Sequence, residues 1–161
     1  CSAVAIIAII IFLVLLVNGV LFNKNKSTLI AYPANSREVQ YDIPDSVTVI
    51  SDWAFCDSKK LNRITMPDSV IEIGEGAFCN CALLDEIEIP DSVVKIDDCA
   101  FRGCTSLDTV IIPDSVKDMG WGIFDGCEET VVVYCNEGSL AQEYCRRNGI
   151  KEARLSEKRD D

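Results

Sequence analysis

The sequence predicts a right-handed solenoid, mainly β or mixed α/β, with parallel strands along one face and a short capping helix at the C-terminal end. Two observations lead to this fold class. The tetrapeptide Pro-Asp-Ser-Val recurs four times at intervals of 23 residues, beginning at Pro44, Pro67, Pro90 and Pro113. Phenylalanine keeps the same interval, at Phe55, Phe78, Phe101 and Phe124. A fixed period of roughly 20 to 50 residues is typical of solenoid proteins.

Each repeat unit contains a strand that is followed by a turn. Residues 84–89 end in the apolar–polar alternation of a half-buried strand. Pro90 ends this strand because proline cannot donate a hydrogen bond to the ladder, and the Asp-Ser pair after it favours a turn. From Val93 to Phe101 the apolar residues lie three or four positions apart, which predicts a short strand or a helical turn on the opposite side of the coil.

A single unit of this length cannot bury its own apolar face, so the units must stack. Further apolar columns recur at the same interval, such as Leu61, Leu84 and Leu107. Stacking would place these columns in one continuous core, with parallel strands about 4.8 Å apart. We therefore predict four repeat units over residues 44–135.

The C-terminal end of the array carries the signals of a capping helix. Residues 130–135 are expected to form the last strand. Ser139 is a suitable N-cap residue, and Gly149 is a suitable residue to end the helix in the left-handed conformation. We assign residues 136–155 to a C-terminal cap and 156–161 to a charged tail that we expect to be disordered.

The N-terminal end is strongly apolar. From Ala3 to Val17 the sequence has no polar residue. This run is short of the roughly 20 residues that a membrane-spanning helix needs, and it fits the core of a signal peptide. We expect residues 1–17 to be a signal or membrane-anchor segment. Two alternatives remain open, namely very apolar strands that continue the solenoid and a lipoprotein-type start at Cys1.

The repeat resembles the BspA-like leucine-rich repeat, a family of surface proteins in bacteria and parasitic protists. Residues 89–112, which read IPDSVVKIDDCAFRGCTSLDTVII, carry its pattern in full. Residues 18–34 are similar to the entry hairpin that often opens such arrays, and residues 138–150 to their closing helix. We therefore assign residues 18–43 to an entry hairpin and a capping strand. The resemblance implies adhesion or recognition at a cell surface, with ligands among host matrix proteins, and no enzymatic activity in the repeat itself.

Composition excludes several other functions. The net charge is −11, with 26 acidic against 15 basic residues, so the chain repels the phosphates of nucleic acids. The sequence has no histidine, which is the commonest general base and zinc ligand. No nucleophile, base and orienting group can be assembled from its motifs. We expect neither an enzyme nor a cofactor.

Columns of cysteine and aspartate have structural explanations. Cys81, Cys104 and Cys127 share one column, where a free cysteine behaves as a small hydrophobic residue. We predict buried thiols there, in preference to disulfides between coils or a metal site at Cys79-x-Cys81. The aspartates that follow the four prolines could form a calcium site, but a role as turn residues explains them better.

Polar positions of successive strands in a solenoid form one continuous face. By column, the candidate protein-binding residues are Asn62, Arg63, Thr65, Asp85, Glu86, Glu88, Asp108, Thr109 and Ile111. The same columns continue to Val131, Val132 and Tyr134 in the last unit. Because the middle of this face is acidic, we expect it to attract a basic protein partner. Trp121 replaces an acid in its column, and we expect it to pack on the C-terminal cap, with a contact hot spot as the alternative.

These observations lead to one leading functional hypothesis. We expect a surface-displayed or secreted protein that binds a protein ligand through its sheet face. The N-terminal segment could attach this protein to a membrane. The alternative is a structural or self-associating spacer of the cell envelope with no specific ligand.

Overall fold

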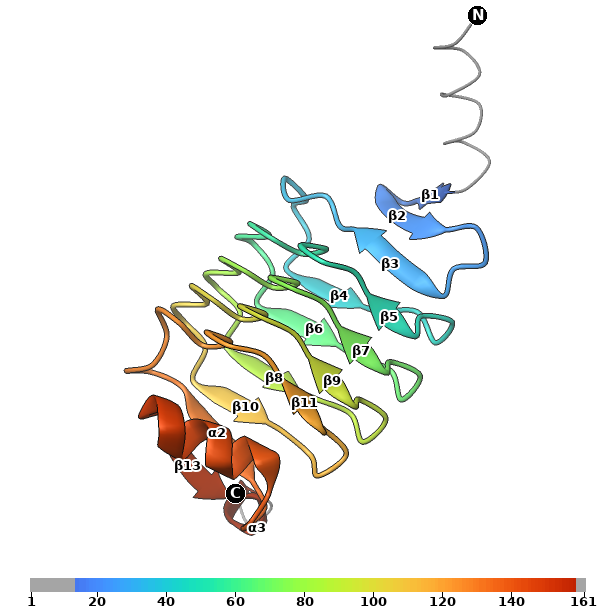
Figure 1. The fold of residues 1–161 in the computed structure, drawn as a ribbon. Coiled ribbons are helices and arrows are strands. Elements are labelled where there is room, and N and C mark those ends of the chain that lie inside the picture. The colour runs from blue at the N-terminus through green and yellow to red at the C-terminus, as the bar shows by residue number, and fades with distance from the viewer. Residues whose placement is uncertain (1–13, 159–161) are drawn as a thin grey trace, which may run out of the picture.

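The computed structural model describes residues 14–158, and these form a solenoid whose coils stack along one axis (Figure 1). Two sheets lie on opposite sides of the coils. The seven-stranded sheet contains, in order, β1 (Val14–Val17), β2 (Val20–Asn23), β3 (Thr28–Ala31), β5 (Val49–Ile50), β7 (Glu72–Ile73), β9 (Lys95–Ile96) and β11 (Asp118–Met119). The six-stranded sheet contains, in order, β13 (Lys151–Arg154), β12 (Val132–Cys135), β10 (Thr109–Ile111), β8 (Glu86–Glu88), β6 (Arg63–Thr65) and β4 (Gln40–Asp42).

The register of both sheets follows the sequence repeat. In the six-stranded sheet Arg63 pairs with Glu86, and Glu86 pairs with Thr109, all in parallel strands. On the other side Ile73 pairs with Ile96 in the same manner. The solenoid and its parallel strands are therefore confirmed. The segment after each Pro-Asp-Ser-Val turn, for which a short strand and a helical turn were both open, contains a two-residue strand.

The core is a stack of aromatic rings between the two sheets. Four phenylalanines are almost completely buried, and their rings stack from coil to coil with centroids 5.1, 5.2 and 5.8 Å apart: Phe55, Phe78, Phe101 and Phe124. Tyr32 stacks on the first of these rings at 5.1 Å, and Tyr144 meets the last one edge-on at 6.2 Å. Aromatic side chains thus continue the core to both ends of the array, which explains the constant phenylalanine column.

Antiparallel strands begin the seven-stranded sheet. β1 and β2 are joined by a tight turn in which Asn18 and Gly19 have φ of 50° and 83°, the pattern of a two-residue hairpin. β2 then pairs with β3 antiparallel, and β3 pairs with β5 parallel. Residues 14–17, which were predicted to end the signal or anchor segment, are therefore a strand of the fold.

Residues 1–13, the remainder of that predicted segment, lie outside the described residues. Among the described residues, no helix combines the length and apolar character needed to cross a membrane. The domain boundaries drawn from the sequence stay a prediction.

The C-terminal cap contains a helix, a strand and a second, short helix. α2 (Leu140–Asn148) begins after Ser139, whose hydroxyl oxygen accepts a hydrogen bond from the Gln142 backbone N–H, and ends at Gly149 with φ of 69°. Both predicted cap residues are confirmed. The chain then adds β13 in parallel to β12, a strand that the sequence did not predict. α3 (Leu155–Lys158) follows, so the expected disorder is wrong for residues 156–158, while 159–161 lie outside the described residues.

Candidate binding face

The outward side of the six-stranded sheet presents the polar columns of the repeat. In each three-residue strand the middle side chain, such as Ile64 or Ile87, points into the core, and its two neighbours point outward. We call this surface the six-strand face and define it by its outward residues: Gln40, Asp42, Arg63, Thr65, Glu86, Glu88, Thr109, Ile111, Val132 and Tyr134. Parallel pairing in register places each residue beside its counterpart in the next coil.

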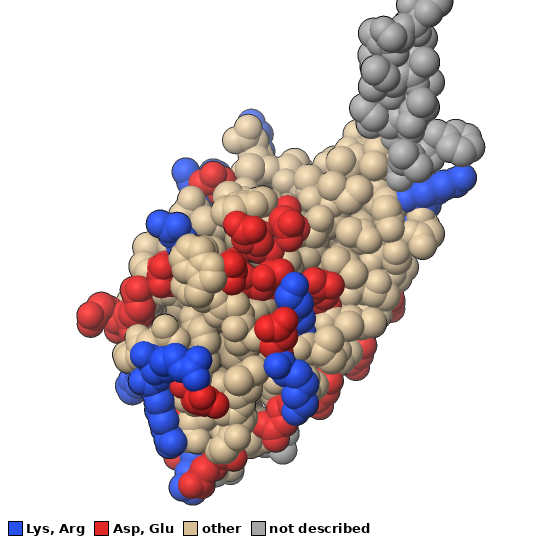
Figure 2. All heavy atoms as spheres, in the orientation of Figure 1, with Lys and Arg blue, Asp and Glu red and all other residues tan. Residues whose placement is uncertain are grey.

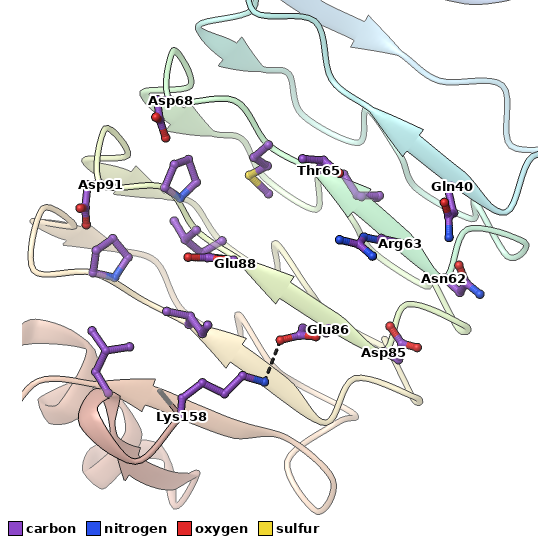
Figure 3. Close-up of a pocket in the computed structure, with 17 residues that line it drawn as sticks. Gln40, Asn62, Arg63, Thr65, Asp68, Asp85, Glu86, Glu88, Asp91 and Lys158 are labelled. Atoms are coloured by element: carbon purple, nitrogen blue, oxygen red, sulfur yellow. Dashed lines mark ion pairs between the residues drawn. The ribbon is translucent and has the colours of Figure 1, made fainter. Parts of the chain in front are cut away.

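A hollow of about 800 Å³ lies over this face (Figure 3). All predicted binding residues except Asp108 and Thr109 line it: Asn62, Arg63, Thr65, Asp85, Glu86, Glu88 and Ile111. Gln40, which belongs to the same columns in the first coil, also lines it. The structure adds lining residues that column reasoning had not selected, namely Ile64, Met66, Asp68, Ile89, Pro90, Asp91, Pro113, Leu155 and Lys158. Asp68 and Asp91 had been recognised only as turn residues. They extend the acidic surface along the strand ends.

The charge of the hollow is predominantly negative. Its acidic lining residues are Asp68, Asp85, Glu86, Glu88 and Asp91, and its basic ones are Arg63 and Lys158. Figure 2 shows that acids also extend over the face seen there, with several bases gathered near the C-terminal end and others scattered over the surface. Carboxylates that line a hollowed surface attract cationic groups and slow the approach of anions.

One basic side chain enters this surface from the C-terminal cap. Lys158 reaches from α3 across the sheet, and its Nζ lies 2.8 Å from Oε1 of Glu86 (Figure 3). The same Nζ lies 5.6 Å from the ring centroid of Tyr134, within the range of a cation–π contact. The hydrogen bond to Glu86 raises the pKa of Lys158 above its usual value of 10.5.

Two residues of the last unit differ from the sequence prediction. Val131 was placed on the face, but it is 1% exposed. Its backbone N–H bonds the Cys127 carbonyl oxygen within the same turn, whereas the N–H of Asp108 in the preceding coil bonds the Asp85 carbonyl oxygen of the coil before it. The backbone before β12 therefore differs from that of the other coils, and the Val131 side chain is buried. Trp121 was expected to pack on the cap, yet the residue is 64% exposed. The expectation of cap packing is therefore wrong.

The cysteines within the described residues are free thiols. In the shared column, the thiol of Cys81 donates to the Phe55 carbonyl oxygen at 3.2 Å, and that of Cys104 donates to the Phe78 carbonyl oxygen at 3.1 Å. Cys127 makes the same contact with Phe101 at 3.6 Å. Each thiol thus bonds to the preceding coil, which confirms the prediction of buried thiols in a column.

Two of the buried thiols resist ionisation. Burial raises the pKa of Cys127 and Cys145 to about 12. The described residues contain no group of three or more cysteines, aspartates, glutamates or histidines that could hold a metal ion. The aspartates after the prolines stand in tight turns, in which for example the Val47 N–H bonds the Pro44 carbonyl oxygen.

The coiled parallel sheets, the stacked aromatic core and the polar outward columns of the repeat define the class of leucine-rich repeat solenoids. A family model described as the BspA type leucine rich repeat region matches residues 32–149 in six copies. The chain therefore belongs to the BspA type leucine-rich repeat family. The match extends on both sides of residues 44–135, over which the sequence predicted four units.

Solved bacterial structures share this fold. The pneumococcal vaccine antigen PcpA is 30% identical over 74% of this chain and 30% of its own, with a TM-score of 0.71. A leucine-rich repeat protein from Eubacterium ventriosum is 32% identical over 76% of this chain and 33% of its own, also with a TM-score of 0.71. A leucine rich cell surface protein from Faecalibacterium prausnitzii is 25% identical over 86% and 42%, with a TM-score of 0.61.

This chain therefore spans about a third of the length of the first two structures. A comparison with curated proteins returns no match.

Proposed function

We propose that this chain is a surface-displayed or secreted binding module that recognises a protein ligand through the six-strand face. The observation that carries the proposal is the acidic hollow, which lies over strands from successive coils and contains most of the predicted binding residues. A repeat scaffold holds such residues at fixed spacing, so little order is lost when a partner binds.

Similar proteins support an extracellular role. One solved relative is described as a vaccine antigen and another as a cell surface protein. A hollow of this charge suits a protein that presents lysine or arginine side chains, and host matrix proteins are one source of such partners. No residue set for catalysis enters the proposal, because its lining residues fit contact and attraction rather than a reaction.

Reversal of two charges tests the proposal. In the variant Glu86→Lys/Glu88→Lys, two outward carboxylates of β8 become cations at the centre of the hollow. Wild type and variant are applied to an array of immobilised extracellular matrix proteins, and binding is measured by biolayer interferometry. We expect the wild type to bind at least one member and the variant to bind it much more weakly, because like charges then face each other.

A matched control separates this effect from overall charge. Glu75→Lys/Glu129→Lys makes the same change in charge at exposed positions that do not line the hollow. It is expected to bind like the wild type. Equal binding by all three proteins would remove the six-strand face from the proposed function.

The alternative role is a self-associating spacer. The outer edge strand β13 carries Lys151, Glu152 and Arg154, and charges on an edge strand oppose end-to-end pairing of sheets. Sedimentation equilibrium over a wide concentration range tests this role. Concentration-dependent assembly together with no binding on the array would favour the spacer over the binding module.

A further inference from the structure

The C-terminal cap covers one end of the six-strand face. α3 follows β13 directly, packs against β12 and β13, and contributes Leu155 and Lys158 to the lining of the hollow. From there the Lys158 side chain passes β10 to reach Glu86 on β8, since β10 lies between β12 and β8 in the sheet. A segment outside the repeat thus occupies part of the surface that the repeat builds.

The position of the Lys158 ammonium group shows which chemistry this surface accepts. Its Nζ contacts a carboxylate, Glu86, on one side and faces the ring of Tyr134 on another. A carboxylate and an aromatic face together suit a primary ammonium group on a long aliphatic stem. Asp85 and Glu88 add negative charge nearby in the hollow, so the surroundings favour a second cation as well.

The contact is also weak enough to exchange. The side chains of Lys158 and Glu86 keep 32% and 54% of their exposed surface, so water reaches both. Ion pairs of this kind contribute little to stability, because solvent screens them and both side chains lose freedom. A partner that brings several cations can therefore displace a single lysine.

The geometry points to α3 as a competitor of the protein ligand within the same chain. Its Lys158 ammonium group occupies the position between Glu86 and Tyr134 that a lysine side chain of a basic protein segment takes on binding. This inference rests on the proposed function and names its partner class: a protein segment with clustered lysines. It also means that the partner reaches this position only when Lys158 leaves Glu86 and Tyr134.

The contact itself is tested without a ligand. N-hydroxysuccinimidyl acetate modifies amines in their neutral form, and the ion pair with Glu86 holds Lys158 protonated. Mass spectrometry follows acetylation of Lys158 and of the exposed Lys117 in the same sample. We expect Glu86→Gln to raise the rate of acetylation of Lys158 by about threefold and to leave the rate at Lys117 unchanged. Glu88→Gln is the control, since Glu88 makes no ion pair with Lys158 among the described residues.

Competition is then tested with hexalysine as the probe, by isothermal titration calorimetry on the full chain. Lys158→Ala should bind hexalysine roughly threefold to tenfold more tightly than the wild type, because no lysine of the chain then occupies the position between Glu86 and Tyr134. Lys117→Ala removes the same charge from the other side of the solenoid and should give a smaller gain. In the Glu86→Gln background, Lys158→Ala should give no gain beyond that of Lys117→Ala.

The outcomes separate this inference from the proposed function. Equal acetylation of Lys158 in the wild type and Glu86→Gln, or equal hexalysine binding by Lys158→Ala and Lys117→Ala, overturns the competitor. Failure of every variant to bind hexalysine also overturns it. The proposed function fails independently, when charge reversal at Glu86 and Glu88 leaves binding to the matrix proteins unchanged.

Discussion

At Gly74 the backbone of one coil lies directly against the turn of the preceding coil. A Cβ atom built there would lie 2.5 Å from Oδ1 of Asp52 and 2.7 Å from its backbone nitrogen. The same Asp52 oxygen accepts a hydrogen bond from the Glu75 N–H at 3.0 Å, so it is held in place. The close approach explains why glycine stands here, where the preceding coil has Ser51.

Substitution of this glycine should destabilise the array. We expect Gly74→Ala to lower the free energy of unfolding by about 1–3 kcal/mol, because the methyl group pushes two hydrogen-bonded coils apart. Urea denaturation measures the change. Ser51→Ala, at the same column one coil earlier, is the control and should change stability by less than about 0.5 kcal/mol. Similar stability of wild type and Gly74→Ala would show that the coils are less tightly stacked than the structure indicates.

The buried thiols predict a pH dependence. Burial raises the pKa of Cys145 from 9.0 to about 12, so the unfolded chain ionises this thiol at a lower pH than the folded chain. Its contribution to stability is complete below pH 9 and is lost as the pH rises toward 12. Between about pH 8.5 and 10.5 the wild type should therefore lose up to about 2 kcal/mol more than Cys145→Ala. If the free energies of unfolding of the two proteins, measured in urea, changed in parallel over this pH range, the raised pKa of Cys145 would be contradicted.

At the scale of elements, α2 closes the C-terminal end of the core. Tyr144 on this helix meets the ring of Phe124 edge-on, and its hydroxyl accepts a hydrogen bond from the Ile123 backbone N–H at 2.9 Å. The helix is fixed at its start by Ser139 and at its end by Gly149, with an ion pair between Glu143 and Arg147 on its surface.

Removal of the N-cap should weaken this closure. We expect Ser139→Ala to cost about 1 kcal/mol, since the Gln142 N–H loses its acceptor. Hydrogen exchange should show the added opening mainly in α2 and β13, because each coil contacts only its neighbours. Ser106→Ala, at an exposed position without a hydrogen bond to its hydroxyl group, is the control. Uniform acceleration along the whole array would contradict this local effect.

Elements that obey the repeat or carry their own capping signals could be predicted from the sequence, whereas β13 and α3 could not. The phenylalanine column, the strand at residues 86–88 and the two helix caps each have a local chemical reason that is visible in the sequence. β13 and α3 lack the repeat signal, and β13 is ordered by pairing with β12. Val131 followed its column in the prediction, but its N–H bonds the Cys127 carbonyl oxygen within its own turn and its side chain is buried in the core.

The residues of the candidate site likewise fall into those that the repeat predicted and those that it did not. Outward strand residues such as Glu86 follow from strand alternation and were predicted. The contributions of Asp68 and Asp91 needed the three-dimensional hollow, because their columns also serve as turns. Lys158 could not be assigned to the face from sequence, since its contact with Glu86 joins residues far apart in the chain.

At the scale of the whole molecule, the stacked coils place equivalent residues of a short repeat side by side, and these residues form one acidic, hollowed surface. The aromatic core extends from Tyr32 to Tyr144 and holds the strands of that surface in register. Under the proposed function, a partner would meet residues of several coils at once, and most of its binding energy would come from the few at the centre.

The most direct test of this account is the affinity of Glu86→Lys/Glu88→Lys for a matrix protein that the wild type binds. The account predicts a Kd at least about tenfold higher for this variant, because two central attractions become repulsions. It predicts an unchanged Kd for Glu75→Lys/Glu129→Lys. Equal Kd values for the wild type and Glu86→Lys/Glu88→Lys would contradict the assignment of the six-strand face as the binding surface.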